Sequence, residues 1–77
     1  MKKYYANTTI FGIDRKTGYE NKILIGEEIQ IISENEDFIF ISSTELVDSK
    51  NSPIVISTSK QVFKESTTLA EKSKKYS

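Results

Sequence analysis

Hydrophobic and polar residues alternate along much of the first 33 residues, the pattern typical of β-strands with one buried face. Residues 4–13 form the first such run, and residues 19–25 and 27–33 form two more. Gly26 separates the last two runs and predicts a bulge or a sharp bend. In the first run, one face carries Tyr5, Thr9, Phe11 and Ile13.

Residues 38–41, Phe-Ile-Phe-Ile, are apolar without alternation, which predicts a central strand covered on both faces. The acidic segment 33–37 would join this strand to the preceding half-exposed one. Residues 14–18 are predicted to form a hairpin loop, with Asp14 capping its own turn and Gly18 at positive φ. Residues 48–53 form another loop, and Pro53 is expected to open a strand over 54–56.

The C-terminal third allows two interpretations. Ser42 with Glu45, and Thr58 with Gln61, match the capping box that begins a helix, but they fit equally well a strand that turns and re-enters the sheet. We expect a strand to about residue 65, followed by a tail with at most one helical turn started by Thr68 and Glu71. A continuous helix over 59–75 is the alternative.

Composition favours β-structure, because the chain holds eleven isoleucines against three leucines and two alanines. The predicted fold is all-β: a small five-stranded antiparallel barrel or sandwich, with an SH3-like barrel as first choice. An α+β fold, an antiparallel sheet with one C-terminal helix, is second. Residues 1–66 would form the domain and residues 67–77 a weakly ordered Lys-rich tail. The predicted core is Phe11, Ile13, Ile23, Ile25, Ile29, Ile31, Phe38, Phe40, Ile54 and Ile56.

The same composition argues against catalysis. The chain has no cysteine and no histidine, and so lacks a thiolate, the commonest general base and the commonest metal ligand. It has no Gly-rich phosphate loop and no nucleophile beside a base. We therefore expect no enzyme, no catalytic residue, no cofactor and no metal site. With no apolar run of membrane-spanning length and no signal-peptide pattern, we expect a cytoplasmic protein without a membrane partner.

Charge is the feature that rises above this background. The total is zero, but residues 20–48 hold eight acidic residues and one basic residue, whereas both terminal segments are mainly basic. The termini could neutralise the middle within one molecule through cross-strand pairs. Alternatively, the middle forms an acidic face for a basic partner. The candidate binding residues of that face are Glu27, Glu28, Glu34, Glu36, Asp37 and Glu45.

The expected function is therefore that of a small non-enzymatic protein that engages another protein through this acidic face. Small acidic-faced proteins of phages and mobile elements often occupy the nucleic-acid site of a larger basic protein. Size, composition and charge segregation suggest that class by association. The alternative is a nucleic-acid-binding regulator that uses lysines beside stackable rings. Its candidate residues are Lys2, Lys3, Tyr4, Lys72, Lys74 and Lys75. A third possibility is a structural subunit that assembles through a free strand edge.

Overall fold

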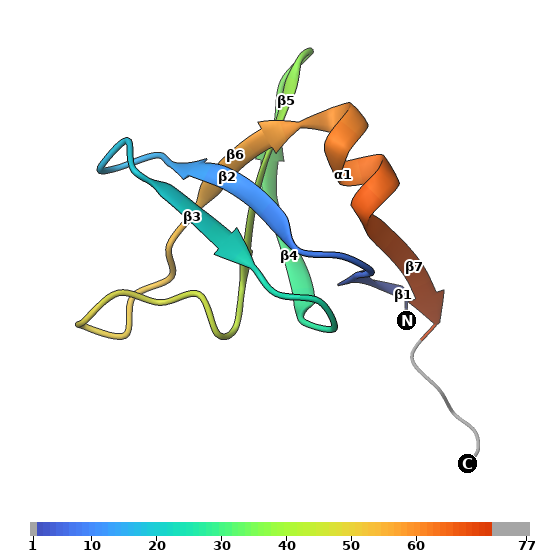
Figure 1. Ribbon diagram of the computed structural model, residues 1–77, viewed down its shortest axis with the longest axis horizontal. Helices are drawn as coiled ribbons and strands as arrows, with labels where there is room; N and C mark the ends of the chain where they lie inside the picture. The colour runs from blue at the N-terminus through green and yellow to red at the C-terminus, as the bar shows by residue number, and fades with distance from the viewer. Residues whose placement is uncertain (1, 72–77) are drawn as a thin grey trace.

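The computed structural model describes residues 2–71, which form seven antiparallel strands and one short helix in a curled half-barrel (Figure 1). Hydrogen-bonded neighbours follow the order β3-β2-β6-β5-β4-β1-β7, so β3 and β7 are the two edges and β5 is near the middle. The elements are β1 (Lys2–Ala6), β2 (Ile10–Asp14), β3 (Glu20–Ile23), β4 (Glu28–Glu34), β5 (Phe38–Ser43), β6 (Ile56–Ser59), α1 (Lys60–Ser66) and β7 (Thr67–Glu71).

Isoleucine side chains fill the inner face of the sheet. Two of the register pairs, Ile10 with Ile23 and Ile41 with Ile56, join residues that are fully buried. Directly opposed side chains on one face of an antiparallel pair lie close enough to pack, and β-branched pairs do so well. The full core cluster is Ala6, Ile10, Ile23, Ile29, Ile39, Ile41, Ile56 and Phe63, with Tyr4, Leu46 and Ile54 packed against it.

The predicted core is half wrong for two main reasons. Strand β2 buries the opposite face from the one expected, and β5, expected to be covered on both faces, leaves the face of Phe38 exposed. Ile23, Ile29 and Ile56 are buried, and Phe40 and Ile54 are partly buried. The remaining five predicted residues are exposed by between 43% and 66%. Those five are Phe11, Ile13, Ile25, Ile31 and Phe38.

Gly12 explains the error in β2. The inward positions of this strand are Ile10, Gly12 and Asp14, whose small or polar members disguise the buried face. A Cβ at Gly12 would lie 2.7 Å from the carbonyl oxygen of Ser57, so only glycine lets β2 approach β6 this closely. The large residues of β2 therefore face outward.

A different cause exposes Ile31. Strand β1 pairs with β4 only at Glu28 and Ile29, so the second half of β4 has β5 on one side and none of the described strands on the other. A bulge between Ile31 and Ser33 also shifts the register there. Ile31 shares its face with the buried Ile41 but lacks the neighbours that would cover it.

The turn predictions are confirmed. A carboxylate oxygen of Asp14 accepts the backbone N–H of Lys16 at 2.7 Å, and Gly18 has φ +80°. Gly26 has φ +91° in the turn that links β3 to β4. Both glycines occupy the left-handed region that side chains disfavour.

The predicted first strand over 4–13 is in fact two strands. The chain leaves β1 at Asn7, whose N–H donates to the carbonyl of Ser66 at 2.8 Å, and it re-enters the sheet at Ile10. Strand β1 pairs with β4 and β7, whereas β2 pairs with β3 and β6. Alternation continues across the break, so the pattern alone does not reveal it.

The C-terminal third also departs from the prediction. Helix α1 begins after Ser59, whose hydroxyl oxygen accepts the N–H of Val62 at 3.1 Å, and Phe63 buries its ring at 5.1 Å from that of Tyr4. Residues 67–71 then form β7, with five register pairs to β1, instead of belonging to a tail. Residues 72–77 lie outside the described residues. Neither predicted helix start caps a helix: Thr58 lies in β6, and Ser42 is buried in β5, where its hydroxyl donates to the carbonyl of Ile54.

The barrel-like all-β class agrees with the prediction, with seven strands in residues 2–71 where five were expected. The additional strands come from the split first run and from β7. An SH3-like barrel in particular stays a prediction.

Substitutions on opposite faces of β5 should differ sharply in effect. Ile41→Ala removes a fully buried side chain and should lower the free energy of unfolding by about 2–5 kcal/mol. Phe38→Ala, at a half-exposed site, should cost no more than about 1.5 kcal/mol. Urea unfolding of both variants measures the difference, and equal losses would contradict the assignment of the two faces.

Candidate functional site

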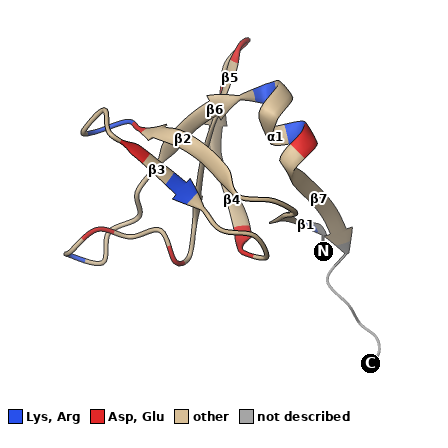
Figure 2. Cartoon of the chain, viewed as in Figure 1, with Lys and Arg blue, Asp and Glu red and all other residues tan. Residues whose placement is uncertain are grey.

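Three of the six predicted acidic residues lie together at the turn between β4 and β5. Glu34, Glu36 and Asp37, here called the acidic hairpin tip, project at one end of the molecule (Figure 2). Glu34 forms a salt bridge of 3.3 Å with Lys60. Within residues 2–71, neither of the other two carboxylates forms one. Net negative charge therefore remains at the tip.

Asn35 holds this turn in shape. Its side-chain oxygen accepts the backbone N–H groups of Asp37 at 2.9 Å and Phe38 at 2.8 Å, and its own N–H donates to the carbonyl of Phe38. An asparagine side chain that bonds two or three residues ahead mimics a backbone turn. The carboxylates are therefore not needed to form the turn.

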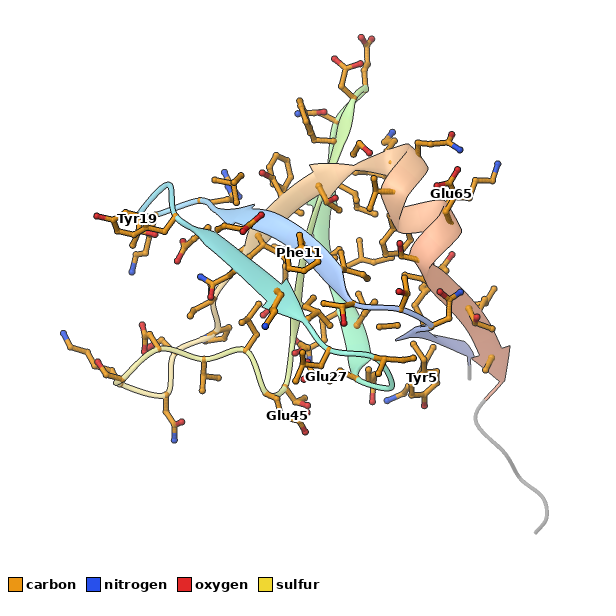
Figure 3. All side chains as sticks on the ribbon, in the orientation of Figure 1. Tyr5, Phe11, Tyr19, Glu27, Glu45 and Glu65 are labelled. Atoms are coloured by element: carbon orange, nitrogen blue, oxygen red, sulfur yellow. The ribbon has the colours of Figure 1, made fainter. Side chains whose placement is uncertain are left out.

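The other three acidic residues lie elsewhere. Glu27 and Glu45 are at the end of the molecule opposite the hairpin tip (Figure 3). Glu28 forms a 2.9 Å salt bridge with Lys3, and Glu27 accepts a 2.6 Å hydrogen bond from the hydroxyl of Ser43. The six residues thus form two separate groups and do not share one face.

The residues predicted to bind nucleic acid are only partly described. The Lys3 ammonium is held by its hydrogen bond and charge interaction with Glu28, which raise the pKa of Lys3. The ring of Tyr4 packs against Phe63 and is only partly accessible for stacking. Lys2 lies in β1, and Lys72, Lys74 and Lys75 lie outside the described residues. In the described part, Lys3 and Tyr4 are both engaged within the molecule.

An apolar surface that the sequence pattern did not predict lies on the outer face of the sheet. Ile13 and Phe40 are each register partners of Ser57, so their side chains lie on one face across β2, β6 and β5. Phe11 and Phe38 lie two residues along the same strands and therefore on the same face. We name these four residues, Phe11, Ile13, Phe38 and Phe40, the outer patch.

Serine separates the two halves of the outer patch. Ser57 lies between Ile13 and Phe40, and Ser59 is the register partner of Phe38. Small side chains on β6 leave the larger side chains of β2 and β5 standing to either side. Arg15 lies over the ring of Phe40, with its guanidinium carbon 4.5 Å from the ring centre. The outer patch is therefore apolar, with one cation stacked at its edge.

A cleft beside the β2–β3 turn is lined by two carboxylates that accept hydrogen bonds from nearby backbone N–H groups. Asp14 accepts backbone N–H groups of its own turn. Backbone N–H groups of Ser52 and Lys50 hold the pKa of Asp48 below its usual value. Both carboxylates are thus engaged by backbone donors. The cleft is lined by Asp14, Arg15, Lys16, Thr17, Asp48, Pro53, Ile54 and Val55.

Residues 2–71 contain neither a cluster of metal-ligand type nor a helix of membrane-spanning type. No group of three or more acidic residues is arranged to hold a metal ion in this part of the chain. No helix there is long and apolar enough to cross a membrane.

Comparisons with protein-family models, curated proteins and solved structures give no match to this chain. Any functional assignment therefore rests on the surfaces themselves.

Asn35→Ala should weaken the β4–β5 hairpin, because two backbone N–H groups lose their acceptor. We expect a loss of about 1 kcal/mol in the free energy of unfolding. Replacing Glu36 and Asp37 by serine should change it by only a few tenths of a kcal/mol. Thermal unfolding of the two variants measures the contrast. A larger loss in the Glu36 and Asp37 variant would mean that the carboxylates maintain the turn.

Proposed function

We propose that this chain is a small non-enzymatic binding protein that engages another protein through the outer patch and the acidic hairpin tip. The observation that carries the proposal is the exposure of large apolar side chains on one face of the sheet, including 53% of Phe11 and 47% of Phe38. Grouped apolar side chains on a small soluble domain are typical of interaction sites. Aromatic residues in particular are enriched at such sites.

The negative charge beside the outer patch indicates which side chains a partner surface would carry. Phe38 directly follows Asp37, so apolar surface and net negative charge adjoin at the β4–β5 turn. A matching protein surface would carry apolar side chains beside lysine or arginine. Opposite charges at the rim chiefly speed association and select the partner, while the buried apolar centre supplies most of the affinity.

Only three of the six acidic residues expected from sequence belong to the proposed binding surface. Glu34, Glu36 and Asp37 remain candidate binding residues. Glu27 and Glu45 lie at the other end of the molecule, and Glu28 directly follows Glu27 at the start of β4. Nucleic-acid binding through the termini is less supported, because Lys3 and Tyr4 have partners within the chain. A cytoplasmic phage or mobile-element protein that blocks a basic nucleic-acid-binding protein remains one form of this proposal.

The test is affinity capture from an extract of the native host, with identification of bound proteins by mass spectrometry. A Phe11→Ser, Phe38→Ser double variant removes half of the outer patch. A matched control, Val62→Ser with Leu69→Ser, removes two exposed apolar side chains outside it. We expect a protein that binds wild type and the control but not the patch variant. Retention of the same proteins by all three, or recovery of nucleic acid instead, would contradict the proposal.

Rate measurements with the captured partner then test the acidic hairpin tip. Replacing Glu36 with Ser and Asp37 with Asn should slow association most at low ionic strength and change dissociation little. Equal association rates for this variant and wild type at low salt would exclude a steering role for the tip.

A further inference from the structure

Strand β3 offers an unpaired edge with a defined set of backbone groups. Asp14 donates its N–H to the carbonyl of Tyr19, which fixes the alternation of hydrogen-bonded pairs between β2 and β3. Asn21 and Ile23 therefore direct their backbone groups toward β2, and Glu20 and Lys22 direct theirs away from it. Strand β3 pairs with β2 alone among the described strands, and Figure 1 shows its outer side without a paired strand. Such an edge is a template for another strand.

The charged residues of one β3 strand are complementary to those of a second β3 strand placed antiparallel to it. We infer that two copies of the chain associate through antiparallel pairing of their β3 strands, centred on Asn21. In that register Glu20 of each copy exchanges backbone hydrogen bonds with Lys22 of the other. Their side chains lie on the same face as directly opposed partners, so the two-fold axis generates two ion pairs.

The two adjacent registers are disfavoured by the same residues. A shift in one direction places Glu20 opposite Glu20 of the second copy, and a shift in the other places Lys22 opposite Lys22. Like charges directly opposed on a sheet are destabilising. A shift by a single residue would present backbone groups that β2 already uses. Charge thus selects the register centred on Asn21.

Exposed apolar side chains at the two ends of β3 support the same arrangement. Tyr19 and Ile25 are the two most exposed of the large hydrophobic residues described, at 75% and 66%. Pairing centred on Asn21 brings the exposed Tyr19 of one copy to the end of β3 in the other. Its register partner there, Ile23, is already buried, and the exposed Leu24 and Ile25 follow directly. Each end of the short strand pair would therefore gain an apolar contact that the single chain leaves in water.

The inference is independent of the proposed function, because it uses a different part of the surface. Pairing of β3 strands about a two-fold axis perpendicular to the sheet keeps the outer patches of both copies on one face. Each patch remains accessible, since no outer-patch residue lies on β3. If the chain proves monomeric, the proposed binding through the outer patch is unaffected. If the outer patch binds no partner, the proposed pairing of β3 strands is unaffected.

Charge reversal tests the register directly. Lys22→Glu places glutamates opposite each other at both symmetric positions, and Glu20→Lys does the same with lysines. Each variant should weaken self-association roughly tenfold or more, as measured by sedimentation equilibrium at low ionic strength. The double variant Glu20→Lys, Lys22→Glu restores both pairs and should associate like wild type. Lys64→Glu, an equal change of charge on the exposed face of α1, should have no effect.

Mixing the two single variants provides the decisive arm. At a concentration at which wild type is half dimeric, each alone should be mainly monomeric and folded by circular dichroism, whereas an equimolar mixture should form a heterodimer with opposite charges at both positions. A wild-type chain that remains monomeric at millimolar concentration would overturn the inference. Undiminished association of Lys22→Glu, or failure of the mixture to associate, would overturn it as well.

Discussion

The structure depends on six isoleucines that share the inner face of one sheet. Ile10, Ile23, Ile39, Ile41, Ile56 and Ile29 come from five strands, and each is buried to at least 95%. With no cysteine to form a disulfide, a chain of 77 residues relies on this packing for its stability. Because side chains alternate between faces along a strand, fixing one face also fixes what the other presents. The exposure of the outer patch is thus a direct consequence of how the core is built.

The C-terminal segment, which comprises α1 and β7, covers the ends of this core. Helix α1 contributes Phe63, which packs on Tyr4 of β1, and β7 then pairs along β1. Ser59 caps the helix on one side, and the hydroxyl of Thr67 donates to the carbonyl of Phe63 on the other. A seven-residue helix would be marginal alone, so the aromatic contact and the flanking strands stabilise it.

Prediction from the sequence succeeded where a local rule determines structure. Asp14, Gly18 and Gly26 form their turns through side-chain hydrogen bonds or positive φ, which depend on few neighbours. It failed where the answer depends on distant strands. The inward position of β2 is occupied by Gly12 because β6 passes close by, and no residue near Gly12 in the sequence indicates that contact. The split between β1 and β2 likewise depends on pairing with β4 and β7.

The candidate site was predictable in part for the same reason. The cluster of Glu34, Glu36 and Asp37 is contiguous in sequence, and the hairpin keeps it together. The outer patch brings together β2 and β5, whose large residues all suggested a core. The edge of β3 became visible only from the strand order and from the side on which β2 uses its backbone groups. Pairing between distant segments decides which face and which edge are free.

The division between inner and outer faces can be measured on the isoleucine methyl groups, of which the chain has eleven. A soluble paramagnetic agent added to a methyl-labelled sample accelerates the relaxation of methyl groups that solvent can reach. We expect strong effects at the four exposed isoleucines, 13, 25, 31 and 32, and weak effects at the six buried ones. Strong effects at Ile41 and Ile56 together with protection of Ile13 would show that the two faces are exchanged, and the account of both core and binding surface would be wrong.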